Sequence, residues 1–330
     1  MEYRKLGNTD IEISAIAFGA WAIGGWMWGG NEKKDSLRAL DASLDVGITT
    51  IDTAPIYGMG HSESIVGEAL EGKRQQVKIL TKYGLRWDTK EGQFYFDSKM
   101  NDGTPVKIHK FAGKENVIKE CEESLKRLKT DYIDLYQIHW HDPTTPINET
   151  MEAVAQLKKD GKILAAGVCN YTAALVEEAD QTLEIVSNQV PYSMVKRDIE
   201  ADVVPQSLEK NKAILAYSPL QRGLLTGKIT TDYHFEEGDH RPSTPYFKKE
   251  NLLKTNQFLE EIKSIADDKD ITLAQLVLRW TLDQPGITCA LAGARNEKQV
   301  KENAVAGEVK ITEEEMKFVN EKLDALELEV

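Results

Sequence analysis

Four side chains that can donate, accept or stabilise a proton lie at or just after the ends of apolar segments. Asp52 closes the β-branched run 48–51, and Tyr57 lies in the turn that follows it. Lys82 and His139 each end a later apolar segment. The ends of buried strands hold side chains rigidly at the mouth of a pocket. The set therefore indicates acid–base chemistry on a bound molecule.

Each of these residues has an ordinary structural explanation when it is considered alone. An Asp at a strand end commonly forms a turn, a Tyr commonly packs, a terminal Lys commonly reaches solvent, and a His after an apolar strand is commonly a satisfied core residue. Their joint occurrence at strand ends, in the register expected for one mouth, favours a functional site.

Apolar strand-like segments alternate with amphipathic helical segments along the whole chain. The predicted strands cover residues 14–20, 48–53, 77–82, 132–138, 163–169, 184–190, 213–217 and 287–292. The predicted helices cover residues 35–46, 61–70, 115–128, 146–159, 173–181, 200–210, 251–267, 272–283, 296–305 and a last segment from 312. Doubly apolar strands with crossover helices predict a parallel sheet covered on both faces.

The alternation predicts a single α/β domain over residues 1–330, a (β/α)8 TIM barrel. An N-terminal β-hairpin over residues 2–14 is expected at the bottom of the barrel, and long loops, 83–114 and 221–249, follow strands 3 and 7. The alternative is an open doubly wound sheet. Its dinucleotide fingerprint is missing from the first strand, because Gly19 and Gly24 are too far apart and no GxGxxG opens a helix.

Composition excludes some partners. The formal net charge of −13 argues against a nucleic-acid or anionic-membrane surface, because both require clustered cations. No run approaches the ~20 apolar residues of a membrane helix, and no signal peptide is evident at the N-terminus. The three cysteines form no CxxC pair and fit a reducing, cytoplasmic location.

The stretch from Asp45 to Gly58 resembles the signature of the aldo-keto reductase superfamily. Further stretches resemble the same superfamily in chain order: residues 80–82, 131–139, 161–170 and 217–220. The resemblance covers almost the whole chain, and the bacterial branch similar to channel β-subunits and inositol-operon reductases is the nearest in pattern.

This resemblance implies an NADP(H)-dependent carbonyl reductase with Asp52, Tyr57, Lys82 and His139 as its catalytic residues. Reduction of a carbonyl needs a hydride at carbon and a proton at oxygen. A free phenol, with a pKa of about 10, is a poor acid near neutrality, and a neighbouring cation lowers that value. Lys82 is expected to have this effect on Tyr57 while Asp52 keeps Lys82 charged, and His139 is expected to orient the substrate oxygen.

The resemblance also implies the contacts of an NADPH cofactor. Asn170 and Gln189 would bind the carboxamide, and Tyr217 would stack on the nicotinamide. The other expected cofactor residues are Trp21, Ser218, Leu220, Arg222, Gly223, Gly293, Arg295, Gln299 and Asn303. Arg295 precedes a helix N-terminus and would bind an adenosine 2′-phosphate. Some family members carry a lysine where Gly293 stands in this chain.

The tryptophans predict an aromatic pocket for a small carbonyl substrate, an aldehyde, ketone or sugar. Trp21, Trp26, Trp28, Trp87 and Trp140 all fall at predicted strand ends or in the loops that follow them, whereas Trp280 falls in a helix. The long loops are candidate lids, and the first of them contains Phe94, Tyr95 and Phe96, which would complete the pocket.

Three alternatives compete with this interpretation. His139-Trp140-His141 resembles the metal-binding pair of barrel hydrolases, but the other histidines lie in loops or at helix starts, so no metal is expected. Lys82 could form a Schiff base, which would leave the expected cofactor residues without a role. The chain could also be a redox-sensing, cofactor-binding subunit of another protein with little turnover. A monomer or weak homo-oligomer is expected.

Overall fold

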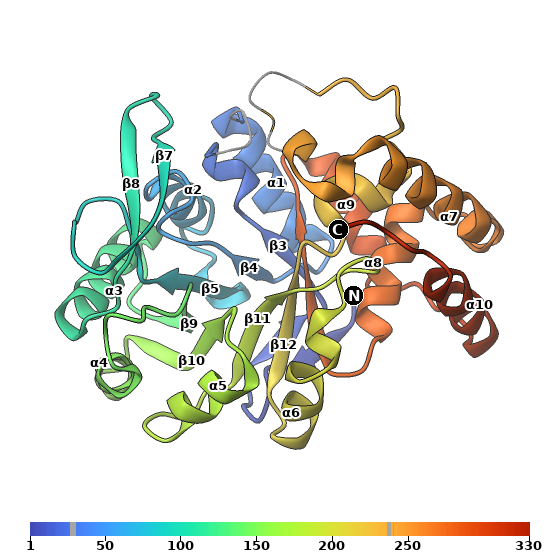
Figure 1. The fold of residues 1–330 in the computed structure, drawn as a ribbon. Helices are drawn as coiled ribbons and strands as arrows, with labels where there is room; N and C mark the ends of the chain where they lie inside the picture. The colour runs from blue at the N-terminus through green and yellow to red at the C-terminus, as the bar shows by residue number, and fades with distance from the viewer. Residues whose placement is uncertain (27–30, 236–238, 240) are drawn as a thin grey trace.

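The computed structural model describes residues 1–26, 31–235, 239 and 241–330. Within these residues, eight parallel strands close into a barrel and follow one another around its wall in chain order (Figure 1). They are β3 (Ile16–Gly19), β4 (Thr50–Asp52), β5 (Lys78–Tyr83), β9 (Ile133–Ile138), β10 (Ile163–Cys169), β11 (Ser187–Pro191), β12 (Ala213–Tyr217) and β13 (Ile287–Gly293). The predicted TIM barrel is confirmed.

Helices between the strands and after the last strand cover the outside of the barrel (Figure 1). They are α1 (Lys33–Asp45), α2 (His61–Ala69), α3 (Lys114–Leu128), α4 (Ile147–Lys159), α5 (Ala173–Asp180), α6 (Val203–Glu209), α7 (Lys249–Asp268), α8 (Leu273–Asp283), α9 (Glu297–Val305) and α10 (Glu313–Asp324). Val117, Cys121 and Leu128 form the buried stripe of α3. Helices α8 and α10 each begin with a capping box, at Thr272 and Thr312.

The N-terminal hairpin closes one end of the barrel, as predicted. It pairs β1 (Tyr3–Lys5) with β2 (Glu12–Ser14) in antiparallel register. Leu6 and Ile13 are fully buried in the same apolar cluster as the inward-facing Leu80 and Leu135. The hairpin therefore fills this end of the barrel with apolar side chains, and the carboxyl ends of the strands lie at the opposite end.

Residues 83–114, expected as a long loop after strand 3, form a long connection with secondary structure that the sequence analysis did not predict. This segment contains a three-stranded antiparallel sheet of β6 (Leu85–Arg86), β7 (Gln93–Lys99) and β8 (Pro105–Lys110), with β8 in the centre. The hairpin of β7 and β8 projects from the barrel (Figure 1). The described part of 221–249 contains three 3-10 helices, η4 (Gln221–Thr226), η5 (Arg241–Ser243) and η6 (Pro245–Phe247), the last of which ends just before α7.

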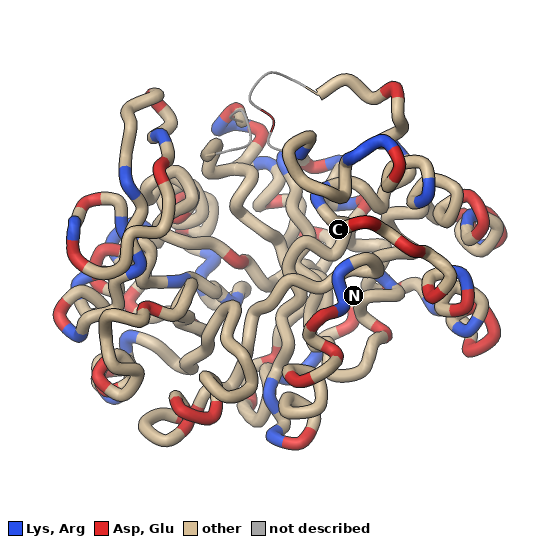
Figure 2. Tube along the Cα trace, viewed as in Figure 1, with Lys and Arg blue, Asp and Glu red and all other residues tan. Residues whose placement is uncertain are grey.

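Acidic and basic residues are interspersed over the outer helices (Figure 2). Many of them form ion pairs on one helix or between neighbouring helices, such as Lys301 with Glu297 in α9 and Lys33 with Glu68 between α1 and α2. None of the helices in the described residues is long and apolar enough to cross a membrane.

Glu120 of α3 is a fully buried carboxylate next to the start of the β6–β8 sheet. Its Oε1 accepts hydrogen bonds from Gly84 N–H and Asn116 Nδ2 at 3.0 and 2.7 Å, and Arg86 lies 3.5 Å from its Oε2. Burial raises the pKa of Glu120 from 4.5 to about 7, although Arg86 and the hydrogen bonds act in the opposite direction.

This carboxylate is expected to make stability depend on pH. Because the folded-state pKa is raised, the stabilisation from Glu120 is fully present below about pH 4.5 and is lost as pH rises through about 7. Between about pH 5 and about pH 8, the free energy of unfolding should fall about 3 kcal/mol more in the wild type than in Glu120→Gln. Denaturant unfolding across this range measures the difference, and parallel profiles would contradict the prediction.

Candidate active site

Asp52 and Lys82 form a buried ion pair at the ends of the neighbouring strands β4 and β5. Lys82 Nζ donates to Asp52 Oδ1 at 2.7 Å and to the carbonyl of Thr53 at 2.9 Å. Lys82 is fully buried, and burial alone lowers the pKa of its ammonium. Asp52 and Tyr57 more than reverse this effect, so the pKa is raised above the ordinary value. Lys82 therefore stays charged at neutral pH.

Tyr57 lies beside this ion pair. Its ring centroid is 5.0 Å from Lys82 Nζ, and its ring stacks on Trp21 with centroids 6.0 Å apart. Burial raises the pKa of Tyr57 to about 12, and Lys82 only partly offsets that rise. The sequence-based expectation of a net decrease in this pKa is therefore wrong for the structure. The phenol is protonated at neutral pH, with a cation beside it to stabilise any negative charge that develops on its oxygen.

His139 follows β9 and meets the ring of Tyr57 edge-on, with ring centroids 5.8 Å apart. Burial and the neighbouring charge of Lys82 hold the pKa of His139 well below its usual range. The imidazole is therefore neutral near pH 7. A neutral imidazole keeps one N–H donor, which suits it to hold an oxygen in place beside the phenol.

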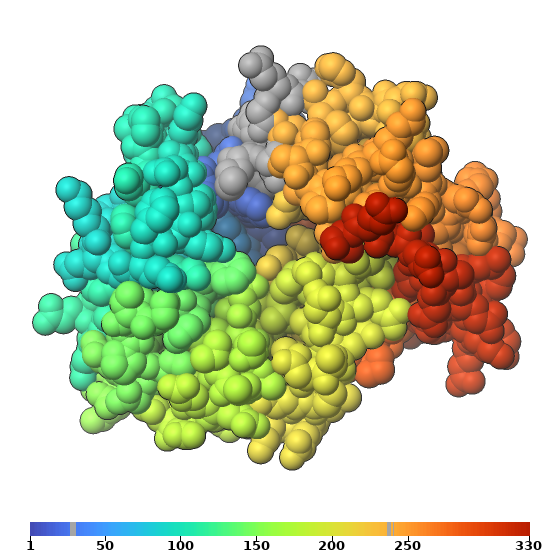
Figure 3. Space-filling model, viewed as in Figure 1, coloured from blue at the N-terminus to red at the C-terminus, as the bar shows by residue number. Residues whose placement is uncertain are grey.

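These groups lie along one cavity of about 910 Å³ at the carboxyl ends of the strands. Asp52, Tyr57 and His139 line it, while Lys82 lies behind them in the barrel wall. In Figure 3 the molecule is hollowed on this face between the teal β7–β8 hairpin and the orange C-terminal third. The four residues expected to be catalytic thus meet at one site.

Aromatic side chains from three loops line one part of the cavity. Trp21 and Trp26 follow β3, Trp140 follows β9, and Tyr95 and Phe96 come from β7. Trp26 stacks on Phe96 with centroids 6.2 Å apart, and its Nε1 donates to Ser98 Oγ at 3.0 Å, which fixes the hairpin against the loop after β3. The ring of Tyr95 packs against the ring of Trp140, with centroids 5.6 Å apart.

Two of the residues predicted to form the pocket do not line the cavity. Trp87 was expected to line the pocket but is absent from the cavity wall, because its ring lies beside the guanidinium of Arg86, 5.4 Å away. Phe94 is 49% exposed and packs against His109 on the β7–β8 hairpin. Trp28, which was also expected to line the pocket, lies outside the described residues.

Hydrogen bonds fix the amide side chains on the opposite wall. Asn170 Nδ2 donates to the carbonyl of His139 at 3.1 Å, and the hydroxyl of Tyr217 donates to Asn170 Oδ1 at 2.9 Å. Gln189 Nε2 donates to Asp52 Oδ2 at 2.8 Å, a contact that the sequence did not predict. Both carboxylate oxygens of Asp52 therefore accept a hydrogen bond, Oδ1 from Lys82 and Oδ2 from Gln189.

The cavity continues away from Tyr57 along the loop after β12 and the start of α9. All the other residues expected to bind a cofactor line it: Trp21, Ser218, Leu220, Arg222, Gly223, Gly293, Arg295, Gln299 and Asn303. Ser218, Arg222 and Gly223 have positive φ values of 55°, 56° and 94°, which turns the backbone along the groove. Gln299 Oε1 accepts from Arg295 N–H at 2.8 Å.

Arg241 is a cavity residue that sequence analysis missed. It lines the groove with Arg222 and Arg295, forms an ion pair with Asp239 at 2.6 Å, and donates to the carbonyl of Arg222 at 3.3 Å. Burial and the charge of Arg241 lower the pKa of Arg295. Three guanidinium groups at the end of a groove that also reaches Tyr57 fit an elongated, anionic dinucleotide.

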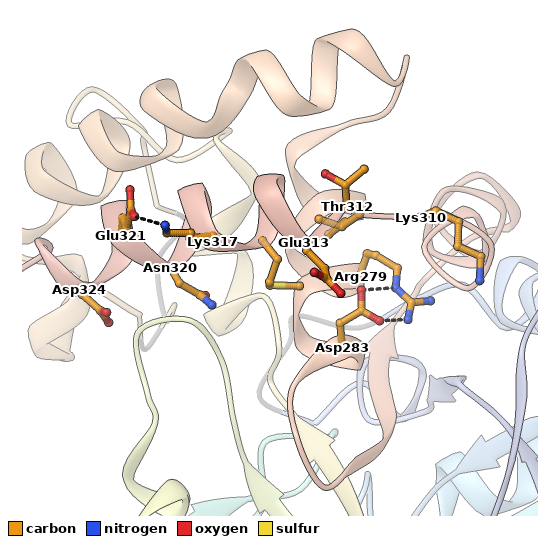
Figure 4. A pocket seen from close by; sticks show the side chains of 11 residues that line it. Arg279, Asp283, Lys310, Thr312, Glu313, Lys317, Asn320, Glu321 and Asp324 are labelled. Carbon is orange, nitrogen blue, oxygen red and sulfur yellow. Dashed lines mark hydrogen bonds and ion pairs between the residues drawn. The ribbon is translucent and has the colours of Figure 1, made fainter.

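A second hollow, of about 660 Å³, lies between α8 and α10 (Figure 4). Four of its charged side chains form two ion pairs, Arg279 with Asp283 and Lys317 with Glu321, whose charged atoms are 3.8 Å apart in the second pair. No residue expected from the sequence to be functional lines it. We therefore assign the chemistry to the first cavity alone.

Comparison with known proteins agrees with this geometry. The profile of the Aldo/keto reductase family matches residues 15–324. The chain belongs to the aldo-keto reductase family. It is 39% identical to the aldo-keto reductase YhdN of Bacillus subtilis (strain 168), covering 98% of this chain and 94% of that protein. It is 37% identical to the NADH-specific methylglyoxal reductase of Escherichia coli (strain K12), covering 99% and 100%.

A solved structure of the same family has the same fold. The glycerol dehydrogenase AKR11B4 from Gluconobacter oxydans matches with a TM-score of 0.88 and 37% identity, covering 98% of this chain and 95% of that chain. The family resemblance identified from sequence is thus confirmed. These aldo-keto reductase relatives include a reductase and a dehydrogenase by name, so this chain is an oxidoreductase of that family.

Proposed function

We propose that this aldo-keto reductase uses NADPH to reduce an aldehyde, ketone or sugar carbonyl to the alcohol. The observation that carries the proposal is the arrangement of Tyr57, Lys82, Asp52 and His139 at the junction of an aromatic pocket and an arginine-lined groove. When bound, a reduced nicotinamide supplies the hydride that no side chain can supply.

Side chains of the protein donate the proton, stabilise the charge and orient the carbonyl oxygen. Tyr57 donates its phenolic proton to the carbonyl oxygen as negative charge develops there. Lys82 stabilises the resulting phenolate, and Asp52 holds the ammonium in place at 2.7 Å. His139 is neutral and donates a hydrogen bond that orients the same oxygen. The aromatic pocket excludes water from the reacting atoms.

Turnover with defined substrates tests this proposal. Purified protein with NADPH is mixed with a panel of aldehydes, ketones and aldoses, and the loss of reduced-cofactor absorbance is followed. Continuous turnover with at least one carbonyl, and isolation of the corresponding alcohol, is the expected result. A single turnover followed by arrest with every substrate would instead favour the sensor subunit.

The preference for NADPH rests on the arginines at the end of the groove. Arg295 lies nearest the start of α9, where helix N–H groups add to the positive potential. A Cβ at Gly293 would meet only Gly19 O, at 3.9 Å, so the space there is open toward the groove. One relative is named as NADH-specific, and the preference in this chain must therefore be measured directly.

We expect Arg295→Ala to weaken NADPH binding by about tenfold to a hundredfold, because hydrogen bonds to charged groups contribute ~1.5–3 kcal/mol. NADH binding should change little, since NADH lacks the 2′-phosphate. Quenching of protein fluorescence by each cofactor gives the dissociation constants. Lys298→Ala, which removes an exposed cation in the first turn of α9, is the matched control. Unchanged NADPH affinity in Arg295→Ala would reject this role.

The aromatic wall should favour aryl carbonyls, because ring faces bury apolar area. Phe96→Ala is expected to raise KM for an aryl aldehyde by roughly tenfold, given ~1.5–3 kcal/mol for burying such a side chain. The kcat should change little, because Phe96 is not among the residues proposed to donate the proton or stabilise the charge. Phe94→Ala is the control, since Phe94 comes from the same strand but does not line the cavity. Equal KM values in both variants would show that Phe96 does not bind substrate.

The proposed location is the cytoplasm. Cys121, Cys169 and Cys289 are all buried and unpaired, as expected for a protein that folds and works in a reducing compartment.

A further inference from the structure

We propose that Ser62 and Glu63 of α2, here called the α2 clamp, are positioning residues that set the geometry between Tyr57 and Lys82. This inference rests on the function proposed above. Both side chains are fully buried, and neither lines the active-site cavity. Each bonds the end of a barrel strand at a residue adjacent to a functional side chain.

Glu63 holds the strand that carries Lys82. Its Oε1 accepts a hydrogen bond of 2.6 Å from the hydroxyl of Thr81, the residue before Lys82 in β5. Side chains alternate along a strand, so Thr81 faces the helices while Lys82 faces the barrel interior. Glu63 Oε2 accepts a bond of 2.6 Å from Arg127 Nε of α3. The carboxylate is thus compensated in charge and fixed between two helices and one strand.

Ser62 holds two further strand ends. Its hydroxyl donates to the carbonyl of Ala20 at 2.8 Å and lies 2.9 Å from the hydroxyl of Thr53. A hydroxyl has one proton, so Thr53 is the donor in that pair. Ala20 precedes Trp21, and Thr53 follows Asp52. The carbonyl of Thr53 is also the second acceptor of Lys82 Nζ. Ser62 therefore fixes a direct partner of the ammonium.

The loop that carries Tyr57 is tied to the same clamp. The N–H of Ser62 donates to the carbonyl of Tyr57 at 3.1 Å, and the N–H of Gly60 donates to that of Pro55 at 2.6 Å. Gly58 has φ +70°, and a Cβ there would lie 2.2 Å from the carbonyl oxygen of Gly24, so the loop is packed backbone to backbone. Tyr57 cannot shift without shifting α2.

The clamp therefore fixes the loop that carries the phenol of Tyr57 relative to strand β5, which carries the ammonium of Lys82. Misplacement of reacting groups by about 1 Å can cost roughly a hundredfold in rate. Loss of the bond between Glu63 and Thr81 should lower kcat and leave KM nearly unchanged, because neither residue lines the cavity.

Thr81→Val tests this proposal because it removes one hydroxyl without changing side-chain volume. We expect kcat to fall at least tenfold, with KM for cofactor and for carbonyl within about twofold of the wild type. Thr81→Ser keeps the hydroxyl and should restore most of kcat. Thr150→Val is the matched control, because Thr150 is a buried threonine whose hydroxyl donates to a backbone carbonyl, at 2.8 Å, outside the site. It should keep the wild-type kcat.

The outcomes separate positioning from stability. Equal kcat values in Thr81→Val and Thr150→Val, at matched folded fractions, would overturn the proposal, as would a failure of Thr81→Ser to recover activity. If Thr81→Val does not fold, Ser62→Ala is measured in its place with the same expectation for kcat and KM. Tyr57→Phe, assayed in parallel, reports on the proposed function itself, so an active Tyr57→Phe would reject that function independently of the clamp.

Discussion

Replacement of Tyr57 by phenylalanine is expected to lower kcat by roughly a thousandfold, since a positioned proton donor contributes about 10²–10⁴-fold. Phenylalanine keeps the ring that stacks on Trp21 and meets His139, and it removes only the hydroxyl. Because burial raises the pKa of Tyr57 to about 12, the wild-type phenol holds its proton at neutral pH. The loss should therefore appear in kcat, with KM nearly unchanged.

The stability of this variant provides the control. The folded-state pKa of Tyr57 is raised, so its neutral form is favoured by folding, and that contribution is lost only as pH rises through about 12. Near pH 7, removal of the hydroxyl should leave the free energy of unfolding within about 1 kcal/mol of the wild type. Steady-state kinetics and denaturant unfolding measure both quantities. A decrease in kcat smaller than about tenfold would assign the proton to another donor.

The residues proposed to be catalytic could be predicted to meet at one site because the barrel strands are simple. Each is an apolar run bounded by turn residues, and parallel strands of one barrel end at the same face. Asp52, Lys82 and His139 end such runs, and this was enough to predict that they lie close together. The same logic placed Asn170, Tyr217 and Arg295 on the cavity wall.

The errors came from segments without an apolar face. Strand β7 reads Gln-Phe-Tyr-Phe-Asp-Ser-Lys, with polar residues at positions of both faces, so its pairing with β8 has no clear periodic signal. Trp87 directly follows the two-residue strand β6, whose pairing with β8 was not predicted either, so the side on which Trp87 lies could not be inferred. Arg241 lines the groove beside Arg222, 19 residues away in sequence, a contact that local sequence does not encode.

The acidity of Tyr57 shows a different limit. The neighbours of a group can be inferred from strand order, and Lys82 was correctly expected beside the phenol. The degree of burial depends on every loop around the site. Here burial contributes more to the pKa than the cation does, so the direction of the net shift could only be known from the folded chain.

Lys82→Met is expected to abolish measurable turnover and also to destabilise the protein. Methionine fills a similar volume but leaves Asp52 buried without its cation, and breaking such a pair costs about 3–5 kcal/mol. The remaining partner of Asp52, the amide of Gln189 at 2.8 Å, is neutral and cannot balance the charge. The kcat should fall by at least a thousandfold, because the phenolate left after proton transfer loses its stabilising charge.

The double variant Lys82→Met/Asp52→Asn separates these two effects. Without the buried carboxylate, the free energy of unfolding should recover most of the loss, whereas kcat should stay at the level of the single variant. The pKa of Lys82 is raised in the folded state, so its stabilisation is complete below about pH 10.5 and is lost as pH rises above that value. The double variant should lack this alkaline loss. If Lys82→Met were as stable as the wild type, the ion pair would contribute no net stability, and the ammonium would be retained for proton transfer alone.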